Sequence, residues 1–289
     1  MDRNGLNYVR ERMPLIGLGT YQIKDSGTIF KILDAALASG YRMVDTAQVY
    51  GNEKAIGEAL HTLLPKYNLK REDIFLITKL KPSSHGVAKA QNAIDDSLRN
   101  LRVNYIDLFI IHWPGAYERD TEFFQIYKMR IYDEYIEVLF GESGKLRAIG
   151  VSNYDVRHLE MLLSSASVQP ALNQCECHPH FDQRELIEYC NQHDIVFQAY
   201  SSLGSPRFMH KLSEDRTIKE IARKYGCSIP QFLLAWAMSQ GISVLPRSGS
   251  PDHVTDNFKS VEYKISKEDI QLVTAPKRQK YCWDPSTVV

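Results

Sequence analysis

Short apolar segments alternate with longer segments of helical periodicity along almost the whole chain, and this alternation restricts the fold more than any other feature. Strands this short and this apolar must be covered on both faces, which is the condition of a parallel sheet. Successive strand–helix units in this number are what closure into a barrel requires. The sequence therefore predicts an α/β protein, a (β/α)8 TIM barrel, with strands at 15–18, 42–45, 74–78, 108–111, 148–151, 171–173, 196–199 and 243–245.

The segments between these strands carry apolar side chains at helical spacing. The first segment ends at Gly40, a residue that commonly terminates helices, and its apolar stripe consists of Ile29, Ile32, Leu33, Ala36 and Leu37. We expect further helices at 56–63, 87–101, 131–140, 156–163, 185–190, 218–225, 230–238 and 254–258. An open doubly wound sheet is less well supported, because Gly17-Leu18-Gly19 lacks the third glycine of a dinucleotide-binding loop.

The chain has 289 residues, close to the roughly 250 of a typical barrel, so we expect a single domain over 1–289. Its long irregular stretches are expected to form variable loops at 115–130 and 201–215 and a C-terminal tail at 275–289. Barrel loops of this kind carry the functional end of the molecule.

Basic and acidic residues balance at 35 each, so we expect no attraction to nucleic acid or to anionic membranes. No run approaches the roughly 18 apolar residues of a membrane span, and residues 1–12 do not resemble a cleaved leader. Five scattered cysteines fit free thiols in a reducing compartment better than a disulfide framework. The sequence predicts a cytoplasmic protein, and we expect a monomer.

Three ionisable residues follow or end predicted strands, where barrel side chains point into the active-site mouth. They are Asp45, Lys79 and His112, and Tyr50 lies in the loop after Asp45. A phenol is a poor acid near neutral pH unless a nearby cation favours its phenolate form. We expect Lys79 to be that cation, with Asp45 orienting it and His112 serving the same substrate oxygen. This arrangement suits carbonyl reduction.

These residues lie in segments that resemble the aldo-keto reductase family, namely Met13–Thr20, Gly40–Glu53, Ile77–Leu80 and Ile111–Pro114. The resemblance extends from Met13 to Asn257. It implies a catalytic tetrad of Asp45, Tyr50, Lys79 and His112. It also implies a nicotinamide cofactor that binds across the barrel mouth without a Rossmann fold, in agreement with the incomplete glycine pattern.

The resemblance further implies a set of cofactor-binding positions. Ser152, Asn153 and Gln174 match the side chains that hold the carboxamide of the nicotinamide, and Tyr200 matches the aromatic residue that stacks on its ring. Further residues would line the pyrophosphate and ribose path or contact the tetrad end of the cofactor, namely Gly19, Thr20, Asp45, Ser201, Leu203 and Ser205.

The segment Leu245–Ser248 resembles the family's phosphate-binding loop, so Arg247 and Ser248 would grip the 2′-phosphate that distinguishes NADP from NAD. The following helix N-terminus would add partial positive charge. Asn257 matches the family pattern, whereas His253 stands where an arginine is usual and Asp256 where a glutamate is usual. The expected cofactor is NADPH (NADP+), with a preference less steep than in typical members.

Aromatic residues are the candidates for the substrate pocket. Tyr21 and Trp113 are candidates by their position in matching motifs, and Trp283 lies on the tail. Aromatic walls suit apolar carbonyl compounds, although Trp283 could equally anchor the tail. The segment Cys175–His180 contains four candidate soft ligands, but it continues the match at Gln174, where the family uses no metal. We therefore expect no metal.

The sequence thus predicts NADPH-dependent reduction of small-molecule aldehydes or ketones to alcohols, with the proton from Tyr50. The alternative is a cofactor-binding, redox-sensing regulatory subunit with little turnover, as in the potassium-channel β subunits that resemble this fold. A barrel isomerase or hydrolase without nicotinamide would require the cofactor motifs to be coincidental, because a barrel by itself specifies no reaction.

Overall fold

Eight parallel strands form one sheet in sequence order in the computed structural model, which describes residues 5–115, 144–274 and 278–287. The sheet closes between its first and last strands, where Ile16 bridges Val244 and Gly19 bridges Arg247 in parallel register. The barrel fold predicted from the sequence is confirmed. Its strands are β1 (Leu18–Gly19), β2 (Met43–Asp45), β3 (Phe75–Leu80), β4 (Leu108–Ile111), β5 (Ile149–Ser152), β6 (Leu172–Glu176), β7 (Val196–Tyr200) and β8 (Ser243–Val244).

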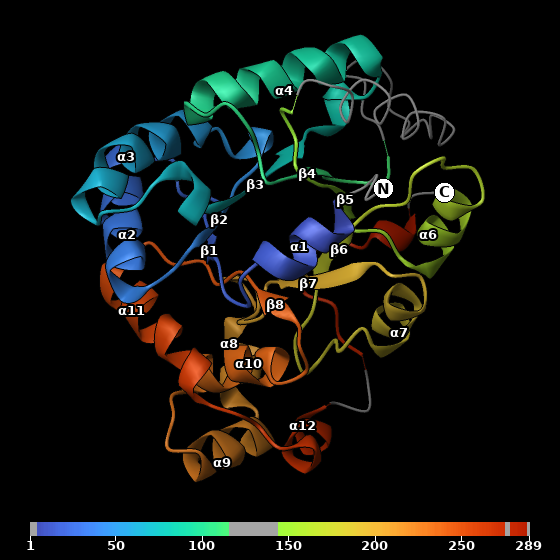
Figure 1. The fold of residues 1–289 in the computed structure, drawn as a ribbon. Coiled ribbons are helices and arrows are strands. Elements are labelled where there is room, and N and C mark those ends of the chain that lie inside the picture. The colour runs from blue at the N-terminus through green and yellow to red at the C-terminus, as the bar shows by residue number, and fades with distance from the viewer. Residues whose placement is uncertain (1–4, 116–143, 275–277, 288–289) are drawn as a thin grey trace.

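Helices surround the strands as a ring, and α1 lies across the middle of that ring (Figure 1). The α-helices of the described residues are α1 (Leu6–Arg12), α2 (Ser26–Ser39), α3 (Glu53–Lys66), α4 (Val87–Leu101), α6 (Val156–Leu163), α7 (Arg184–Gln192), α8 (Met209–Glu214), α9 (Arg216–Lys224), α10 (Ile229–Met238), α11 (Pro251–Phe258) and α12 (Lys267–Val273). Short 3-10 helices lie at η1 (Gln48–Tyr50), η2 (Arg71–Asp73), η3 (Pro82–Ser84), η4 (Lys259–Glu262) and η5 (Pro285–Thr287). The helix expected at 131–140 lies outside the described residues.

Helix α2 shows how local sequence sets an element of this ring. The Asp25 carboxylate accepts a hydrogen bond from the main-chain N–H of Thr28 at 2.7 Å and so caps the first turn. Gly40 ends the helix at φ 107°, a conformation that glycine adopts without steric cost. The predicted apolar stripe is buried against the barrel, as the exposure of Ile29, Ile32, Leu33, Ala36 and Leu37 shows.

Two apolar clusters fill the molecule. The larger cluster lies between the strands and the surrounding helices, and it includes Trp236 of α10. The smaller one consists of side chains on the strands or directly next to them, together with Val9 of α1, and it includes Met43, Phe75 and Ile77. Because β3 begins at Phe75, α1 closes the barrel at the amino ends of the strands and leaves the carboxyl ends for the site.

Three helices differ from the sequence-based expectation, and one of them is α12 at residues 267–273, a segment for which no helix was expected. Helix α1 was not predicted, because only Val9 in its seven residues is buried and the segment reads as polar. The stretch 201–215 was expected to be irregular, but α8 occupies residues 209–214 within it. The expected loop 115–130 lies outside the described residues beyond Gly115. In the tail, the described residues form no α-helix or strand.

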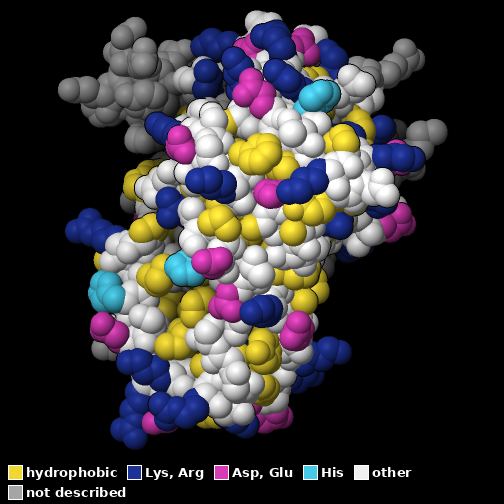
Figure 2. All heavy atoms as spheres, turned by 90° about the vertical axis from the view of Figure 1, so that its left-hand side faces the viewer, with side chains coloured by type: hydrophobic (Ala, Val, Ile, Leu, Met, Phe, Trp, Pro, Cys, Tyr) yellow, Lys and Arg dark blue, Asp and Glu magenta, His cyan; other side chains and the backbone are white. Residues whose placement is uncertain are grey.

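Figure 2 shows the flank of the barrel that lies at the left in Figure 1, where α2, α3 and α11 are labelled. Lysine and arginine side chains on this face are interspersed with aspartate and glutamate side chains and with small apolar areas. Within the part of the chain that the structure describes, no helix combines the length and the apolar character needed to cross a membrane.

Candidate active site

Three of the predicted site residues meet at the carboxyl ends of neighbouring strands. Asp45 is the last residue of β2, Lys79 lies near the end of β3, and His112 directly follows β4. In the parallel register, Asp45 pairs with Ile77 and Lys79 pairs with Ile110. The topology therefore brings the three side chains to one end of the barrel, as the strand-end argument predicted.

The Lys79 ammonium and the Asp45 carboxylate form a buried ion pair. Lys79 Nζ donates to both Asp45 Oδ1 and Oδ2 at 2.7 Å and to the Thr46 carbonyl oxygen at 2.9 Å. The two residues are 1% and 4% exposed. Burial lowers the pKa of Lys79, and the Asp45 carboxylate opposes that shift. The carboxylate thus holds the ammonium at a fixed place in the mouth.

Tyr50 extends over this ion pair from η1. Its phenol oxygen lies 3.5 Å from Lys79 Nζ, at the outer limit of a hydrogen bond, and the ammonium lies 5.1 Å from the centre of its ring. The predicted proximity of Tyr50 to Lys79 is therefore present.

The expected acidification of Tyr50 is wrong for this arrangement. Burial raises the pKa of the Tyr50 phenol well above its usual value, and the negative charge of Asp45 adds to the shift. The Lys79 cation does not reverse this direction, because its charge is matched by Asp45 at a shorter distance. Tyr50 is consequently a neutral phenol at neutral pH.

His112 completes the group. Its ring lies 5.7 Å from the Tyr50 ring, nearly perpendicular to it. Burial and the Lys79 charge lower the pKa of His112 to about 3, so the imidazole is neutral. Its Nδ1 atom is buried without a hydrogen-bond partner in the described residues.

Two amides that sequence reasoning overlooked hold the loop of Tyr50 in place. Gln48 Nε2 donates to the Ala93 carbonyl oxygen at 2.6 Å, so η1 is tied to α4. Asn52 Nδ2 donates to the carbonyl oxygens of Thr20 and Ile23 at 3.0 and 2.9 Å. Both amides lie in the segment Gly40–Glu53, between the end of a strand and the start of a helix. Their polar side chains at this place were the sequence signal that could have identified them.

The expected carboxamide-binding side chains form a hydrogen-bonded layer around the mouth. Asn153 Nδ2 donates to the His112 carbonyl oxygen at 2.9 Å, and its Oδ1 accepts from the Tyr200 hydroxyl at 2.6 Å. Ser152 Oγ donates to the Gln174 carbonyl oxygen at 2.8 Å. Gln174 Nε2 donates to Asp45 Oδ2 at 2.9 Å and so joins this layer to the ion pair.

Gly19 and Thr20 lie where the barrel closes. A Cβ atom on Gly19 would lie 2.8 Å from the Leu245 carbonyl oxygen, so the close approach requires glycine. Thr20 is fully buried, and its Oγ1 donates to the main-chain oxygen of Asp45 at 2.9 Å. In this structure both residues shape the rim beneath Asp45.

The expected residues of the cofactor path after β7 lie in a turn. Ser201 has φ 51°, and its Oγ lies 3.3 Å from Cys282 Sγ of the tail. Leu203 packs against the larger apolar cluster. Ser205 is partly buried, and its carbonyl oxygen accepts the N–H groups that begin α8.

The expected phosphate-binding residues lie between β8 and α11. Arg247 is exposed, and its Nε donates to the Tyr21 carbonyl oxygen at 2.9 Å, while its terminal nitrogens have no partner in the described residues. Ser248 Oγ accepts the N–H of Ser250, which precedes α11. Ser250 is the N-cap residue of α11, and its side chain makes no capping hydrogen bond.

On α11, His253 is exposed and Asn257 is buried. Asp256 Oδ1 accepts a hydrogen bond from Gln231 Nε2 of α10 at 3.0 Å, so this carboxylate is tied to the neighbouring helix. The structure thus brings the tetrad together at one point and distributes the expected cofactor residues around the rim, from β1 to α11.

A model of the Aldo/keto reductase family matches residues 15–277. The chain belongs to this family. Aldo-keto reductase family 1 member A1 of Xenopus tropicalis is 35% identical over 284 residues, which cover 93% of this chain and 86% of that protein. Aldose reductase of Encephalitozoon cuniculi is 36% identical over 276 residues, with 92% and 90% coverage.

Solved structures agree. The aldo-keto reductase MGS-M4, from a Medee basin deep-sea metagenome library, superposes with a TM-score of 0.85 at 33% identity, and the match covers 96% of both chains. Aldose reductase of Schistosoma japonicum gives 0.83 at 29% identity, with 92% and 89% coverage. Membership of the aldo/keto reductase family confirms the resemblance stated from the sequence and makes the chain an oxidoreductase of carbonyl compounds.

In this aldo/keto reductase, aromatic rings border the tetrad. The Tyr21 ring lies 5.0 Å from the Tyr50 ring. The Trp113 ring stacks on His112 at 6.0 Å, and Trp283 meets Trp113 edge-on at 4.6 Å. Tyr21 and Trp283 are 54% and 45% exposed. The three residues predicted as pocket walls therefore lie beside the mouth.

The candidate metal ligands of Cys175–His180 are engaged in other contacts. Among the described residues, no group of three or more histidine, cysteine, aspartate or glutamate side chains is arranged to hold a metal ion. All five cysteines are free, and burial raises the pKa of Cys175 to about 12. His178 and His180 instead contact Tyr281 of the C-terminal tail. The Cys175 and Cys177 thiols donate to main-chain oxygens of Tyr154 and Asp182.

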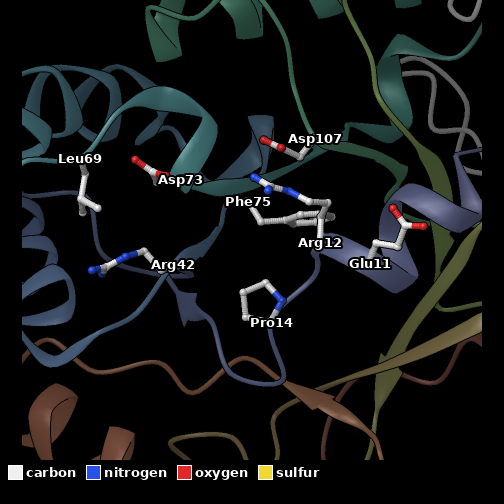
Figure 3. Close-up of a pocket in the computed structure, with 8 residues that line it drawn as sticks. All are labelled: Glu11, Arg12, Pro14, Arg42, Leu69, Asp73, Phe75 and Asp107. Atoms are coloured by element: carbon white, nitrogen blue, oxygen red, sulfur yellow. The ribbon is translucent and has the colours of Figure 1, made fainter.

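A separate pocket of about 270 Å³ lies at the other end of this reductase (Figure 3). Its lining includes Arg42, which precedes β2, and Phe75, which begins β3, so it lies at the amino ends of the strands. In (β/α)8 barrel enzymes the active site lies at the carboxyl ends of the strands. This pocket is therefore distinct from the candidate active site. Its remaining lining residues are Glu11, Arg12, Pro14, Leu69, Asp73 and Asp107.

Proposed function

We propose that this protein reduces aldehydes or ketones to alcohols with NADPH, and that Tyr50 is the proton donor. The observation that carries the proposal is the Lys79 ammonium, fixed by Asp45 at 2.7 Å, with the Tyr50 phenol oxygen 3.5 Å away at the barrel mouth. When bound, NADPH supplies the hydride, and the proton and the orientation fall to side chains of this chain.

A proton donor must hold its proton before the reaction, and the raised pKa of Tyr50 ensures this at neutral pH. As the proton leaves, negative charge develops on an oxygen that already lies near the Lys79 ammonium. A fixed cation stabilises such developing charge without reorganisation. Lys79 therefore acts on the transition state more than on the resting phenol.

His112 supplies a second donor to the same substrate oxygen. Its pKa of about 3 keeps the ring neutral, so one nitrogen carries hydrogen and the other does not. The buried Nδ1 has no acceptor to receive a hydrogen, which favours the hydrogen on Nε2. We assign Nε2 as the atom that orients the carbonyl beside Tyr50.

The rim residues fit a nicotinamide cofactor. Ser152, Asn153 and Gln174 offer hydroxyl and amide groups, the chemistry that a carboxamide requires, and Tyr200 lies against Asn153 with a flat ring for stacking. Gly19, Thr20, Ser201, Leu203 and Ser205 are assigned to the cofactor path, with Thr20 acting through the backbone of Asp45.

The preference for NADPH is supported by the open terminal nitrogens of Arg247, next to the uncapped N-terminus of α11. Ser248 adds a hydroxyl at this place. His253 is a weaker partner for phosphate than arginine, and Asp256 is tied to Gln231, so we propose a preference less steep than that of an arginine-bearing site.

For the substrate, Tyr21, Trp113 and Trp283 form an aromatic border that suits apolar carbonyl compounds. Relatives named aldose reductase, from Encephalitozoon cuniculi and Dictyostelium discoideum, support an aldehyde as one substrate class.

The test is Tyr50→Phe, which removes the phenol oxygen and keeps the ring. NADPH oxidation with a panel of aromatic and aliphatic aldehydes should fall by about 10²-fold or more, the range expected for a general acid. NADPH should still quench tryptophan fluorescence. Full activity of the variant would refute the role of Tyr50. Tight NADPH binding by the wild-type protein with no turnover of any carbonyl would instead indicate the redox-sensing regulatory function.

A further inference from the structure

A buried carboxylate that the proposed mechanism does not use holds the C-terminal tail. Glu176, the last residue of β6, is 0% exposed. Its Oε1 accepts the main-chain N–H of Tyr281 at 2.6 Å, and its Oε2 accepts the main-chain N–H of Cys282 at 3.1 Å. Lys280 Nζ lies 3.0 Å from Oε2. Two successive peptide groups and an ammonium thus converge on one side chain.

The set of donors requires an ionised acid at this position. His178 Nε2 lies 3.1 Å from Glu176 Oε1 and completes a shell of donors around the carboxylate. Burial by itself would raise the pKa of Glu176, but the hydrogen bond from His178 and the charge of Lys280 hold the pKa below its usual value. A neutral amide in this place would direct its own N–H groups at other donors.

Two histidines of the same segment strengthen the attachment. The His178 ring stacks on the Tyr281 ring at 4.6 Å and 17°. His180 Nδ1 lies 2.6 Å from the Tyr281 hydroxyl, and its Nε2 lies 3.1 Å from Asp215 at the start of α9. The main-chain oxygen of His180 accepts the N–H of Gln279 at 2.7 Å. The tail is therefore held through its backbone at Gln279, Tyr281 and Cys282.

The residue after this attachment is Trp283. Its ring meets Trp113 edge-on at 4.6 Å, and Trp113 stacks on His112 at 6.0 Å. A continuous path of contacts therefore leads from the Glu176 carboxylate, through the peptide groups of the tail, to the border of the candidate site. Movement of the tail backbone at Cys282 would displace the Trp283 ring.

We propose that Glu176 is a positioning residue that fixes Trp283 at the mouth and thereby favours aromatic over small aliphatic carbonyl substrates. This rests on the proposed function, since Trp283 can select substrates only if the mouth reduces them. Glu176 acts through the tail and does not itself contact substrate or cofactor.

The activity test is Glu176→Gln, assayed with 4-nitrobenzaldehyde and propanal. The ratio of kcat/KM for the aromatic to the aliphatic aldehyde should fall by about threefold or more, through KM for the aromatic substrate. In a Trp283→Ala background, the same substitution should leave the ratio unchanged, because the side chain through which Glu176 acts is absent. An equal effect in both backgrounds would overturn the proposal.

Asp107→Asn provides a matched control for loss of a buried carboxylate. Asp107 is 1% exposed, accepts the main-chain N–H of Leu76 at 2.9 Å, and lies at the opposite end of the barrel. It should lower stability without changing the substrate ratio. A fall in the ratio for Asp107→Asn equal to that for Glu176→Gln would mean that destabilisation alone explains both.

Limited trypsin digestion tests the attachment independently of activity. Cleavage after Arg278 should be about tenfold faster in Glu176→Gln than in the wild-type protein, because the tail detaches more often once a charge-assisted hydrogen bond is lost. Unchanged cleavage would refute the attachment even if the enzyme is active. Faster cleavage in a protein that reduces no carbonyl would retain the attachment and remove the proposed function.

Lys280→Met is a milder variant should Glu176→Gln fail to fold. It removes only the ammonium of the Lys280 side chain, which is 15% exposed, and leaves the hydrogen bonds from the tail backbone to Glu176. Cleavage after Arg278 should accelerate in the same direction by a smaller factor. No acceleration here would count against the role of the ion pair in holding the tail.

Discussion

Replacement of Asp45 by asparagine tests whether the ion pair at the mouth is as tightly coupled as its geometry indicates. Both carboxylate oxygens of Asp45 accept hydrogen bonds from Lys79 at 2.7 Å, and both residues are almost fully buried. The variant keeps the shape of the side chain and removes its charge. The Lys79 ammonium is then left without its only ion-pair partner in the described residues.

The size of the effect can be bounded in two ways. Removing one partner of a buried ion pair costs about 3–5 kcal/mol of folding free energy. Alternatively, Lys79 gives up its proton on folding, and for a lysine with an unfolded pKa of about 10.4 this costs about 4.6 kcal/mol at pH 7. Lys79 takes whichever protonation state costs less, so the cost of deprotonation is an upper bound. We therefore expect the free energy of unfolding to fall by about 3–4.6 kcal/mol at pH 7.

The pH dependence of the variant's stability follows from the titration of Lys79. Without Asp45, burial depresses the folded-state pKa of Lys79 below its unfolded value. The loss of stability is therefore complete below the folded pKa and disappears as the pH rises towards the unfolded pKa of about 10.4. The upper bound decreases by about 1.4 kcal/mol for each pH unit and reaches about 1.9 kcal/mol at pH 9.

Urea denaturation of wild-type protein and Asp45→Asn at pH 7 and pH 9 measures both quantities. The matched control is the double variant Asp45→Asn, Lys79→Met, which buries no unpaired charge and should regain most of the stability while remaining inactive. A loss below about 1 kcal/mol at pH 7, or an equal loss at both pH values, would refute the reasoning about a coupled buried pair.

Two further predictions concern the proton and the phosphate. Because the pKa of Tyr50 is raised, carbonyl reduction should stay constant between about pH 6 and 9, whereas alcohol oxidation, which needs the phenolate, should rise with pH over that range. Initial rates in both directions check this, and a decline of reduction centred below pH 8 would contradict it. Arg247→Ala should raise the Kd for NADPH by about tenfold and that for NADH by less than about twofold, measured by fluorescence quenching. His253→Ala is the control, with a smaller change expected, and equal effects of Arg247→Ala on both cofactors would show that Arg247 does not read the 2′-phosphate.

The order and type of the barrel elements could be predicted because they depend on local periodicity. The strand at 108–111 agrees with β4 at both ends, and the others shift by a few residues. Helix α1 could not be predicted in this way, because seven residues with one buried side chain carry almost no periodicity. Its place across the barrel depends on Val9 meeting strand side chains distant in sequence.

For the site, the meeting of the strand-end side chains could be predicted from the sequence, but the pKa of Tyr50 could not. Strand ends determine that Asp45, Lys79 and His112 meet, whatever the surroundings. The pKa of Tyr50 depends on how deeply the phenol is buried and on how closely the Asp45 carboxylate pairs with the Lys79 ammonium. Neither the burial nor the pairing distance is determined by the local sequence. The role of Glu176 could not be predicted either, because its partners in the tail are 105 and 106 residues away in sequence.

The neighbours of Asp45 also limit what activity measurements alone can establish. Its Oδ2 accepts from both Lys79 and Gln174, and its Oδ1 accepts from Lys79, so every described partner of the carboxylate is a donor. An amide at this position must turn an N–H group towards one of these donors. Loss of activity in Asp45→Asn would therefore follow from distortion as readily as from lost chemistry. Only the double variant separates the two, because a stable protein with no charge on either residue and no turnover would show that the ion pair itself is required for the reaction.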